Sequence, residues 1–250
     1  MPLRITMPLR ITKRPLRAVF IAVVFAQIYP AASAVAAELD NQVYTFFQMD
    51  QNEYRRIDGE DAYAWEAQGW VGTDSNKLAF KTEGEKVIDG DYEGAELQVL
   101  YSRLVSQFFD VQIGARYDFE PKPERAFAVL GYQGLAPQFF EVDTALFISE
   151  DGDVSARLEG EYELLITQRL ILQPALELNI AAQEVEALGI GSGLTDFEVG
   201  LRLRYEIRRE FAPYIGINYE RDLFDTAEFT RAELGDVDAV AVVAGIRFFF

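Results

Sequence analysis

Apolar and charged residues alternate with a period of two along most of this chain. In residues 197–207 every odd position is apolar or aromatic, and every even position is charged or glycine. The same alternation recurs in residues 108–119, 139–150, 154–165 and 170–181. Because successive side chains of a β-strand point to opposite faces, each segment predicts a strand with one apolar and one polar face.

Twelve segments of this kind are predicted, with turn residues such as Asp58-Gly59 and Asp151-Gly152-Asp153 between them. They cover residues 42–56, 62–72, 77–85, 92–102, 108–119, 125–135, 139–150, 154–165, 170–181, 194–207, 211–223 and 238–250. A soluble β-sandwich would also alternate, but its strands are typically about five to six residues long. Long strands in an even number instead predict an all-β fold, a transmembrane antiparallel β-barrel of about 12 strands.

Two further patterns support a barrel of the outer membrane. The final segment alternates up to Phe250 and resembles the C-terminal recognition signal of outer-membrane barrel proteins. The two longest connections, 182–193 and 224–237, both fall on the outer side if the strands start from the periplasm. Long loops are expected on that side. Aromatic residues near strand ends, among them Trp65, Trp70 and Tyr132, predict interfacial girdles.

Residues 1–36 are interpreted as a signal peptide. This segment contains basic residues and no acidic ones. Residues Ala18 to Ala26 are all apolar, and Ala34 to Ala36 supplies small residues for a peptidase. A retained membrane anchor is the alternative, but a spanning helix needs about 20 apolar residues. The prediction is therefore a cleaved signal peptide at 1–36, a barrel domain at 37–250, and export to the cell outer membrane of a Gram-negative bacterium.

The predicted mature chain is strongly acidic. Residues 1–36 hold five of the 23 basic residues and none of the 41 acidic ones, which leaves 18 bases, 41 acids and a formal charge of −23. This charge disfavours nucleic acid and attracts cations. The sequence has neither Cys nor His. Without histidine it lacks the usual general base and the commonest metal ligand, so no enzyme activity and no certain cofactor are predicted.

The polar faces of the predicted strands are assigned to the barrel interior. They include a charge network formed by Glu96, Arg116, Asp118, Arg157, Glu198, Arg202, Arg204 and Glu206. Further interior charges are Glu66, Lys77, Lys81, Glu83, Glu85, Asp110, Glu141, Asp143, Glu159, Glu161, Glu163, Glu177 and Glu220. Two interpretations stay open: a carboxylate-lined cation path, or an Arg–Glu network that fills and rigidifies the barrel.

Six residues are candidate metal ligands: Met49, Asp50, Glu53, Glu66, Glu159 and Glu161. Met49 could supply a thioether for copper(I) beside the carboxylates of the first strand. A lone methionine in a strand more often faces lipid or fills a gap.

Several long segments resemble the copper resistance protein B family. They are residues 65–85, 95–103, 131–140, 145–160, 167–174 and 191–213. The resemblance implies an outer-membrane barrel that contributes to copper resistance by copper ion passage or binding. It implies copper ions and outer-membrane lipid as partners and suggests a periplasmic multicopper oxidase as another. Family members commonly carry a Met- and His-rich segment before the barrel, whereas Met49 is the only methionine after residue 7 here. The alternative is a general cation-preferring porin, or a structural outer-membrane protein without a specific metal role.

Overall fold

The computed structural model describes residues 42–57, 60–88, 90–232 and 235–250. The predicted signal peptide lies outside these described residues. Within them, no helix has the length and apolar character needed to cross a membrane.

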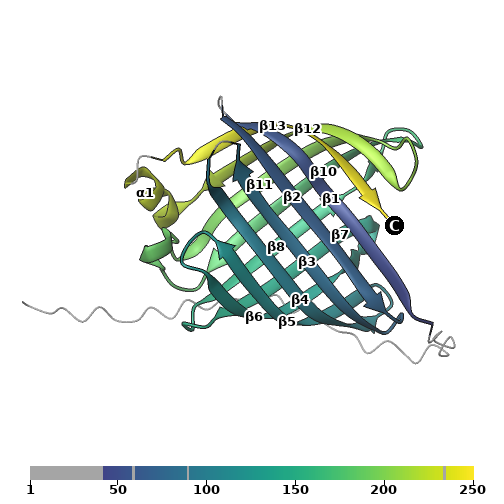
Figure 1. Ribbon diagram of the computed structural model, residues 1–250, viewed down its shortest axis with the longest axis horizontal. Helices are drawn as coiled ribbons and strands as arrows, with labels where there is room; N and C mark the ends of the chain where they lie inside the picture. Colours follow the sequence, from purple (N-terminus) through teal and green to yellow (C-terminus); the bar gives the residue numbers. More distant parts are fainter. Residues whose placement is uncertain (1–41, 58–59, 89, 233–234) are drawn as a thin grey trace, which may run out of the picture. The chain divides into compact units, whose positions relative to one another are not determined.

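Long antiparallel strands make up most of the described chain (Figure 1). The strands are β1 (Tyr44–Ile57), β2 (Glu60–Gly72), β3 (Asn76–Val87), β4 (Tyr92–Ser106), β5 (Phe109–Glu120), β6 (Arg125–Ala136), β7 (Phe140–Ser149), β8 (Val154–Tyr162), β9 (Leu164–Leu165), β10 (Leu170–Ala181), β11 (Gly193–Tyr205), β12 (Phe211–Asp222) and β13 (Asp238–Phe249). Three short helices join them: η1 (Pro137–Phe139), η2 (Glu186–Leu188) and α1 (Phe224–Ala232).

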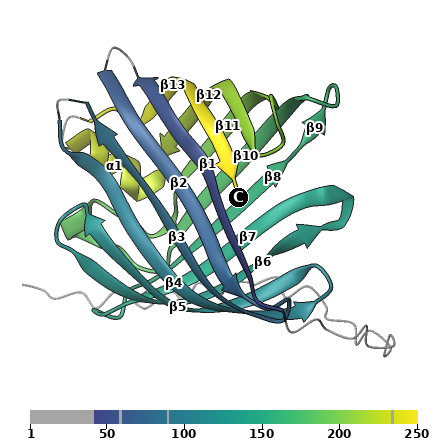
Figure 2. The same ribbon diagram turned by 45° about the vertical axis from the view of Figure 1, so that its right-hand side comes forward.

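The strands close into a barrel. Each strand pairs with its neighbour in the chain, β13 pairs with β1, and β10 pairs with both β8 and β11. The two-residue β9 continues β8 after an interruption at Glu163, so the described residues form twelve wall segments. The predicted closed antiparallel barrel of about 12 strands is therefore confirmed, as both views show (Figures 1 and 2).

The two ends of the barrel differ. At the terminal end, where β1 begins and β13 finishes, the backbones of Phe47 and Phe250 exchange hydrogen bonds of 2.9 and 3.0 Å. At the opposite, loop end lie the longest connections, which carry η2 and α1. There the Gly191 amide donates a 3.0 Å hydrogen bond to the Thr226 hydroxyl, which joins the two longest connections to each other.

The barrel is polar inside and apolar outside. On β5, Ile113 is 59% exposed while its neighbour Gln112 is only 3% exposed. Outward apolar side chains gain nothing from water, but in lipid they match the hydrocarbon around them. The predicted alternation of faces therefore holds along β5, and the same contrast separates Leu201 from Arg202 on β11.

Part of the interior is apolar, which the sequence did not predict. Ala79, Leu100, Val129 and Phe147 form a buried cluster on β3, β4, β6 and β7. Trp70 packs against this cluster, and the Lys77 ammonium lies 5.4 Å from its ring centroid. Trp70 is thus an interior residue, and its assignment to an interfacial girdle is wrong.

Candidate functional site

Interior carboxylates line up across neighbouring strands. Antiparallel pairing places each residue of a row directly opposite the next. The long acidic row, on β7 to β12, is Asp143, Glu159, Glu177, Glu198 and Glu220. The short acidic row, on β2 to β5, is Glu66, Glu83, Glu96 and Asp118. Since like charges directly opposite one another destabilise a sheet, these rows need cations to offset them.

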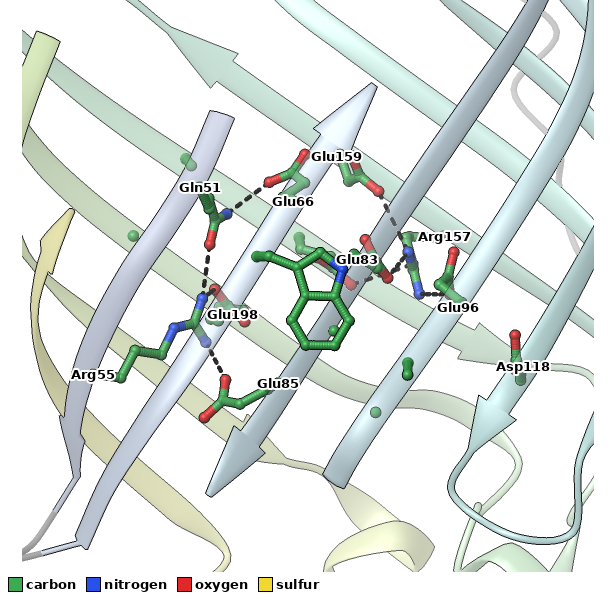
Figure 3. Close-up of a pocket in the computed structure, with 18 of the residues that line it drawn as sticks. Gln51, Arg55, Glu66, Glu83, Glu85, Glu96, Asp118, Arg157, Glu159 and Glu198 are labelled. Carbon is green, nitrogen blue, oxygen red and sulfur yellow. Dashed lines mark hydrogen bonds and ion pairs between the residues drawn. The ribbon is translucent and has the colours of Figure 1, made fainter. Parts of the chain in front are cut away.

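Arg157 supplies a cation between the two rows (Figure 3). From β8 its guanidinium pairs with Glu83 on β3 and lies 3.2 Å from Glu96 on β4. It also lies 3.3 Å from Glu177 and 3.9 Å from Glu159. One guanidinium is therefore shared among four carboxylates.

A second group of ion pairs is centred on Glu53 and excludes water. Glu53 is 1% exposed and accepts from Arg55 at 2.7 Å, from Arg202 at 3.1 Å and from the Tyr214 hydroxyl at 3.0 Å. Arg55 also reaches Glu85 on β3 at 2.7 Å. Because each of these charged groups has a partner, the group forms a network that stabilises the structure.

Of the cavities inside the described barrel, the two richest in carboxylates have volumes of about 290 and 340 Å³, and another of about 250 Å³ lies at the loop end. The loop-side cavity extends to Glu120 and Pro121, and ten carboxylate residues and four arginines are among the described residues that line it. The terminal-side cavity extends to Gln48 and Leu135, and its described lining contains eight carboxylate residues with Lys81 and Arg157. Six residues line both cavities: Glu66, Glu83, Glu96, Arg157, Glu159 and Glu161.

Comparison with known proteins identifies the family. The family model described as Copper resistance protein B precursor (CopB) matches residues 43–250. This chain belongs to the copper resistance protein B family.

Two relatives in the copper resistance protein B family show how much of the chain is shared. Copper resistance protein B of Escherichia coli is 41% identical over 211 residues, covering 84% of this chain and 71% of the relative. The Copper resistance protein B homolog of Pseudomonas syringae pv. tomato is 40% identical with the same coverage. The resemblance inferred from the sequence segments is thereby confirmed.

Solved structures confirm the barrel fold alone. The KdgM porin superposes with a TM-score of 0.52 at 11% identity and covers 82% of this chain and 99% of its own. The NanC porin superposes with a TM-score of 0.53 at 13% identity and the same coverage. This member of the copper resistance protein B family therefore has an outer-membrane-type β-barrel.

The structure brings together three of the six predicted metal ligands. Glu66, Glu159 and Glu161 line both cavities. Glu66 accepts from Gln51 and Glu161 from Gln173, each at 2.7 Å. In the described part of the chain no cation lies within 4.0 Å of Glu66 or Glu161, and Glu159 has only the 3.9 Å contact with Arg157. Of the six predicted ligands, these three are the ones left to attract an ion, and Glu141 in the terminal-side cavity likewise has no ion pair among the described residues.

Of the other three predicted ligands, Asp50 also lines the terminal-side cavity but has a cation partner, whereas Glu53 and Met49 line neither cavity. Glu53 is held by two arginines, and Asp50 accepts from Arg247 at 2.9 Å. Met49 pairs in register with Ala67 on β2 and with Phe248 on β13, which belong to the outward-facing positions of those strands. A bulge follows Met49 and brings Asp50 and Gln51 both to the interior. The grouping of Met49 with these carboxylates is therefore wrong.

The predicted charge network lies in the interior. Arg116 pairs with Glu96 at 2.7 Å and with Asp118 at 2.6 Å. Arg204 pairs with Glu163 and lies 3.8 Å from Glu206. Glu198 lies 3.8 Å from Arg55. Sequence reasoning missed Arg55 as an interior residue because the bulge in β1 shifts the alternation there.

The interior holds no ready-made metal centre among the described residues. No group of three or more carboxylates there has the spacing that would hold a metal ion. The carboxylates form extended rows instead, which suit transient contacts with a passing ion better than one fixed coordination shell.

Proposed function

We propose that this chain is an outer-membrane protein that contributes to copper resistance by admitting copper ions into its barrel, where they bind or pass. Membership of the copper resistance protein B family and the porin-like fold support the resistance role and the site in the outer membrane. Export from the cytoplasm with a cleaved signal peptide at 1–36 is part of the proposal.

The excess of carboxylates over cations in the two cavities carries this proposal. Acidic walls in a narrow, low-dielectric interior raise the local concentration of cations. Carboxylate and amide oxygens with no thiolate or imidazole favour the harder copper(II) over copper(I). Glu66, Glu159 and Glu161 are the best placed to meet the ion, since no arginine holds them closely.

The proposal includes no catalytic step. The 250 residues contain no histidine, so an acyl-transfer or hydrolytic site would lack its usual base. A periplasmic multicopper oxidase that receives or supplies copper at the terminal end is the protein partner proposed from the family resemblance.

Neutralising two of the free carboxylates tests the proposal. The variant Glu159→Gln with Glu161→Gln keeps side-chain size and removes two charges from the shared lining of both cavities. We expect lower copper tolerance in cells that depend on this protein, and a copper(II) conductance reduced about tenfold in planar bilayers. The folded fraction, measured by the electrophoretic shift between unheated and heated protein, should stay unchanged.

The matched control removes two charges from the exposed loop end. Asp151→Asn with Glu228→Gln changes surface carboxylates that line neither cavity. It should leave copper tolerance and conductance at the wild-type level. If the interior variant behaves like this control, or if wild-type barrels carry K⁺ and Cu²⁺ in proportion to their mobility in water, the copper proposal is wrong and a general porin replaces it.

A further inference from the structure

We infer that Arg157 controls ion passage between the two cavities by acting as an internal cation that a permeating ion must displace. The inference rests on the proposed ion passage and assigns the control of that passage to a single side chain. It follows from where Arg157 lies, which carboxylates it pairs with and how its contacts are shared among them.

Arg157 lies at the junction of the two cavities. Of the six residues that line both, it is the only base within the described chain. Its strand, β8, is five strands away from β3 around the ring, yet the guanidinium pairs with Glu83 on β3. The side chain therefore reaches across the interior to carboxylates of the facing strands, and the close-up shows its guanidinium beside Glu83 and Glu96 (Figure 3).

The carboxylates around Arg157 depend on it. Glu83, Glu159 and Glu177 have Arg157 as their sole ion-pair partner among the described residues. Glu96 is different, because Arg116 also pairs with it at 2.7 Å and Gln98 donates to it at 2.7 Å. Removing the guanidinium would leave three acids without a counter-charge at the junction.

The contacts of Arg157 are divided among four carboxylates, so an incoming ion can replace them one at a time. Its distances to Glu96, Glu177 and Glu159 are 3.2, 3.3 and 3.9 Å, and none of the four carboxylates takes a two-pronged pair. Arg202, by contrast, grips Glu53 through Nε and Nη2 at 3.1 Å each. Bidentate ion pairs are stronger than single contacts, so the Arg202 side chain is fixed. An incoming ion can instead replace Arg157 at one carboxylate after another.

Single-channel recording of Arg157→Gln tests the inference. We expect the K⁺ conductance of the full-length barrel in planar bilayers to rise about twofold or more, because the bridging cation is gone and the junction becomes more negative. The control Arg56→Gln removes the same charge from an exposed residue that lines neither cavity. Its conductance should match that of the wild type.

A second variant covers the case in which Arg157→Gln does not fold. Arg157→Lys keeps one positive charge but cannot span four carboxylates with a planar fork, so its conductance should also exceed that of the wild type. Unchanged K⁺ conductance in a folded Arg157 variant, or an equal rise in Arg56→Gln, would overturn the inference.

The K⁺ measurement separates this inference from the copper proposal. A rise in K⁺ conductance without any preference of the wild type for Cu²⁺ refutes copper selectivity and retains Arg157 as the control point. Loss of copper conductance in the Glu159/Glu161 variant supports copper passage. If K⁺ conductance in the Arg157 variants is unchanged at the same time, control by Arg157 is refuted.

Discussion

Single interior carboxylates differ in whether an arginine holds them. Glu53 is enclosed by Arg55, Arg202 and Tyr214, whereas Glu66 and Glu161 accept only from neutral amides among the described residues. The first kind stabilises the wall, and the second kind is available to an ion. We therefore propose that the two open interpretations of the interior charges apply to different residues.

Replacing Glu53 tests the structural role. Glu53→Gln leaves the buried guanidinium of Arg202 without its charge partner and removes one of the partners of Arg55. Breaking such a buried pair costs about 3 kcal/mol of unfolding free energy. Guanidinium-induced unfolding in detergent micelles, followed by tryptophan fluorescence, measures the loss. Arg56→Gln, which breaks the exposed pair with Asp61, should cost less than about 1 kcal/mol. Equal losses of unfolding free energy in the two variants would contradict a structural role for Glu53.

Sequence patterns predicted which face these residues occupy but not which partners they have. Strict alternation put Glu159 and Glu161 inside, and the structure agrees. The pair between Arg157 and Glu83 joins residues 74 positions apart. Such a contact depends on barrel diameter and strand stagger, which local patterns do not contain. Met49 was misplaced for a local reason, the bulge that interrupts alternation in β1.

Strands were predictable as elements because their ends carry clear turn residues. Most predicted boundaries lie within two residues of the observed ones, as for β10 at Leu170–Ala181. The apolar cluster around Phe147 was missed because residues 145–148 are continuously apolar, which hides the inward positions. α1 was missed because nothing in an acidic outer connection required a helix.

The connections at the loop end are linked through Asp153. Its carboxylate accepts from Gln183 at 2.9 Å and from Ser149 at 3.4 Å, and it pairs with Arg125. The hydrogen bond from Gln183 and the nearby Arg125 charge hold the pKa of Asp153 below its ordinary value. A carboxyl with a lowered pKa in the folded state stabilises that state above the unfolded pKa and stops doing so as pH falls through the folded pKa.

Hydrogen exchange of residues 182–192 tests this link. In the wild type, exchange corrected for intrinsic rates should accelerate only below the ordinary pKa of an aspartate side chain, about 3.9, because the pKa of Asp153 is lowered. Asp153→Asn should accelerate exchange already at pH 7, and the exposed neighbour variant Asp151→Asn should not. If all three proteins exchange alike at pH 7, Asp153 does not hold these connections.

At the scale of the molecule, carboxylates outnumber bases among the described residues that line the two cavities, by ten to four and by eight to two. Ion binding to the folded form alone should therefore raise its stability, by about 1.4 kcal/mol at a free ion concentration ten times Kd. Thermal unfolding with increasing Cu²⁺ measures the shift, and Glu159→Gln with Glu161→Gln should reduce it. An equal shift with K⁺ at matched ionic strength would show simple screening instead.

The alternation along β8 also has a consequence for assembly. Arg157, Glu159 and Glu161 are spaced two residues apart on one face, and Ala156, Leu158 and Gly160 lie on the other face. A slip of one residue in pairing would turn every one of these charges toward hydrocarbon. Placing Arg alone at the bilayer midplane costs about 2–4 kcal/mol, with acids adding less. We therefore expect the charges of this strand to disfavour a shifted pairing register while the barrel inserts into the membrane.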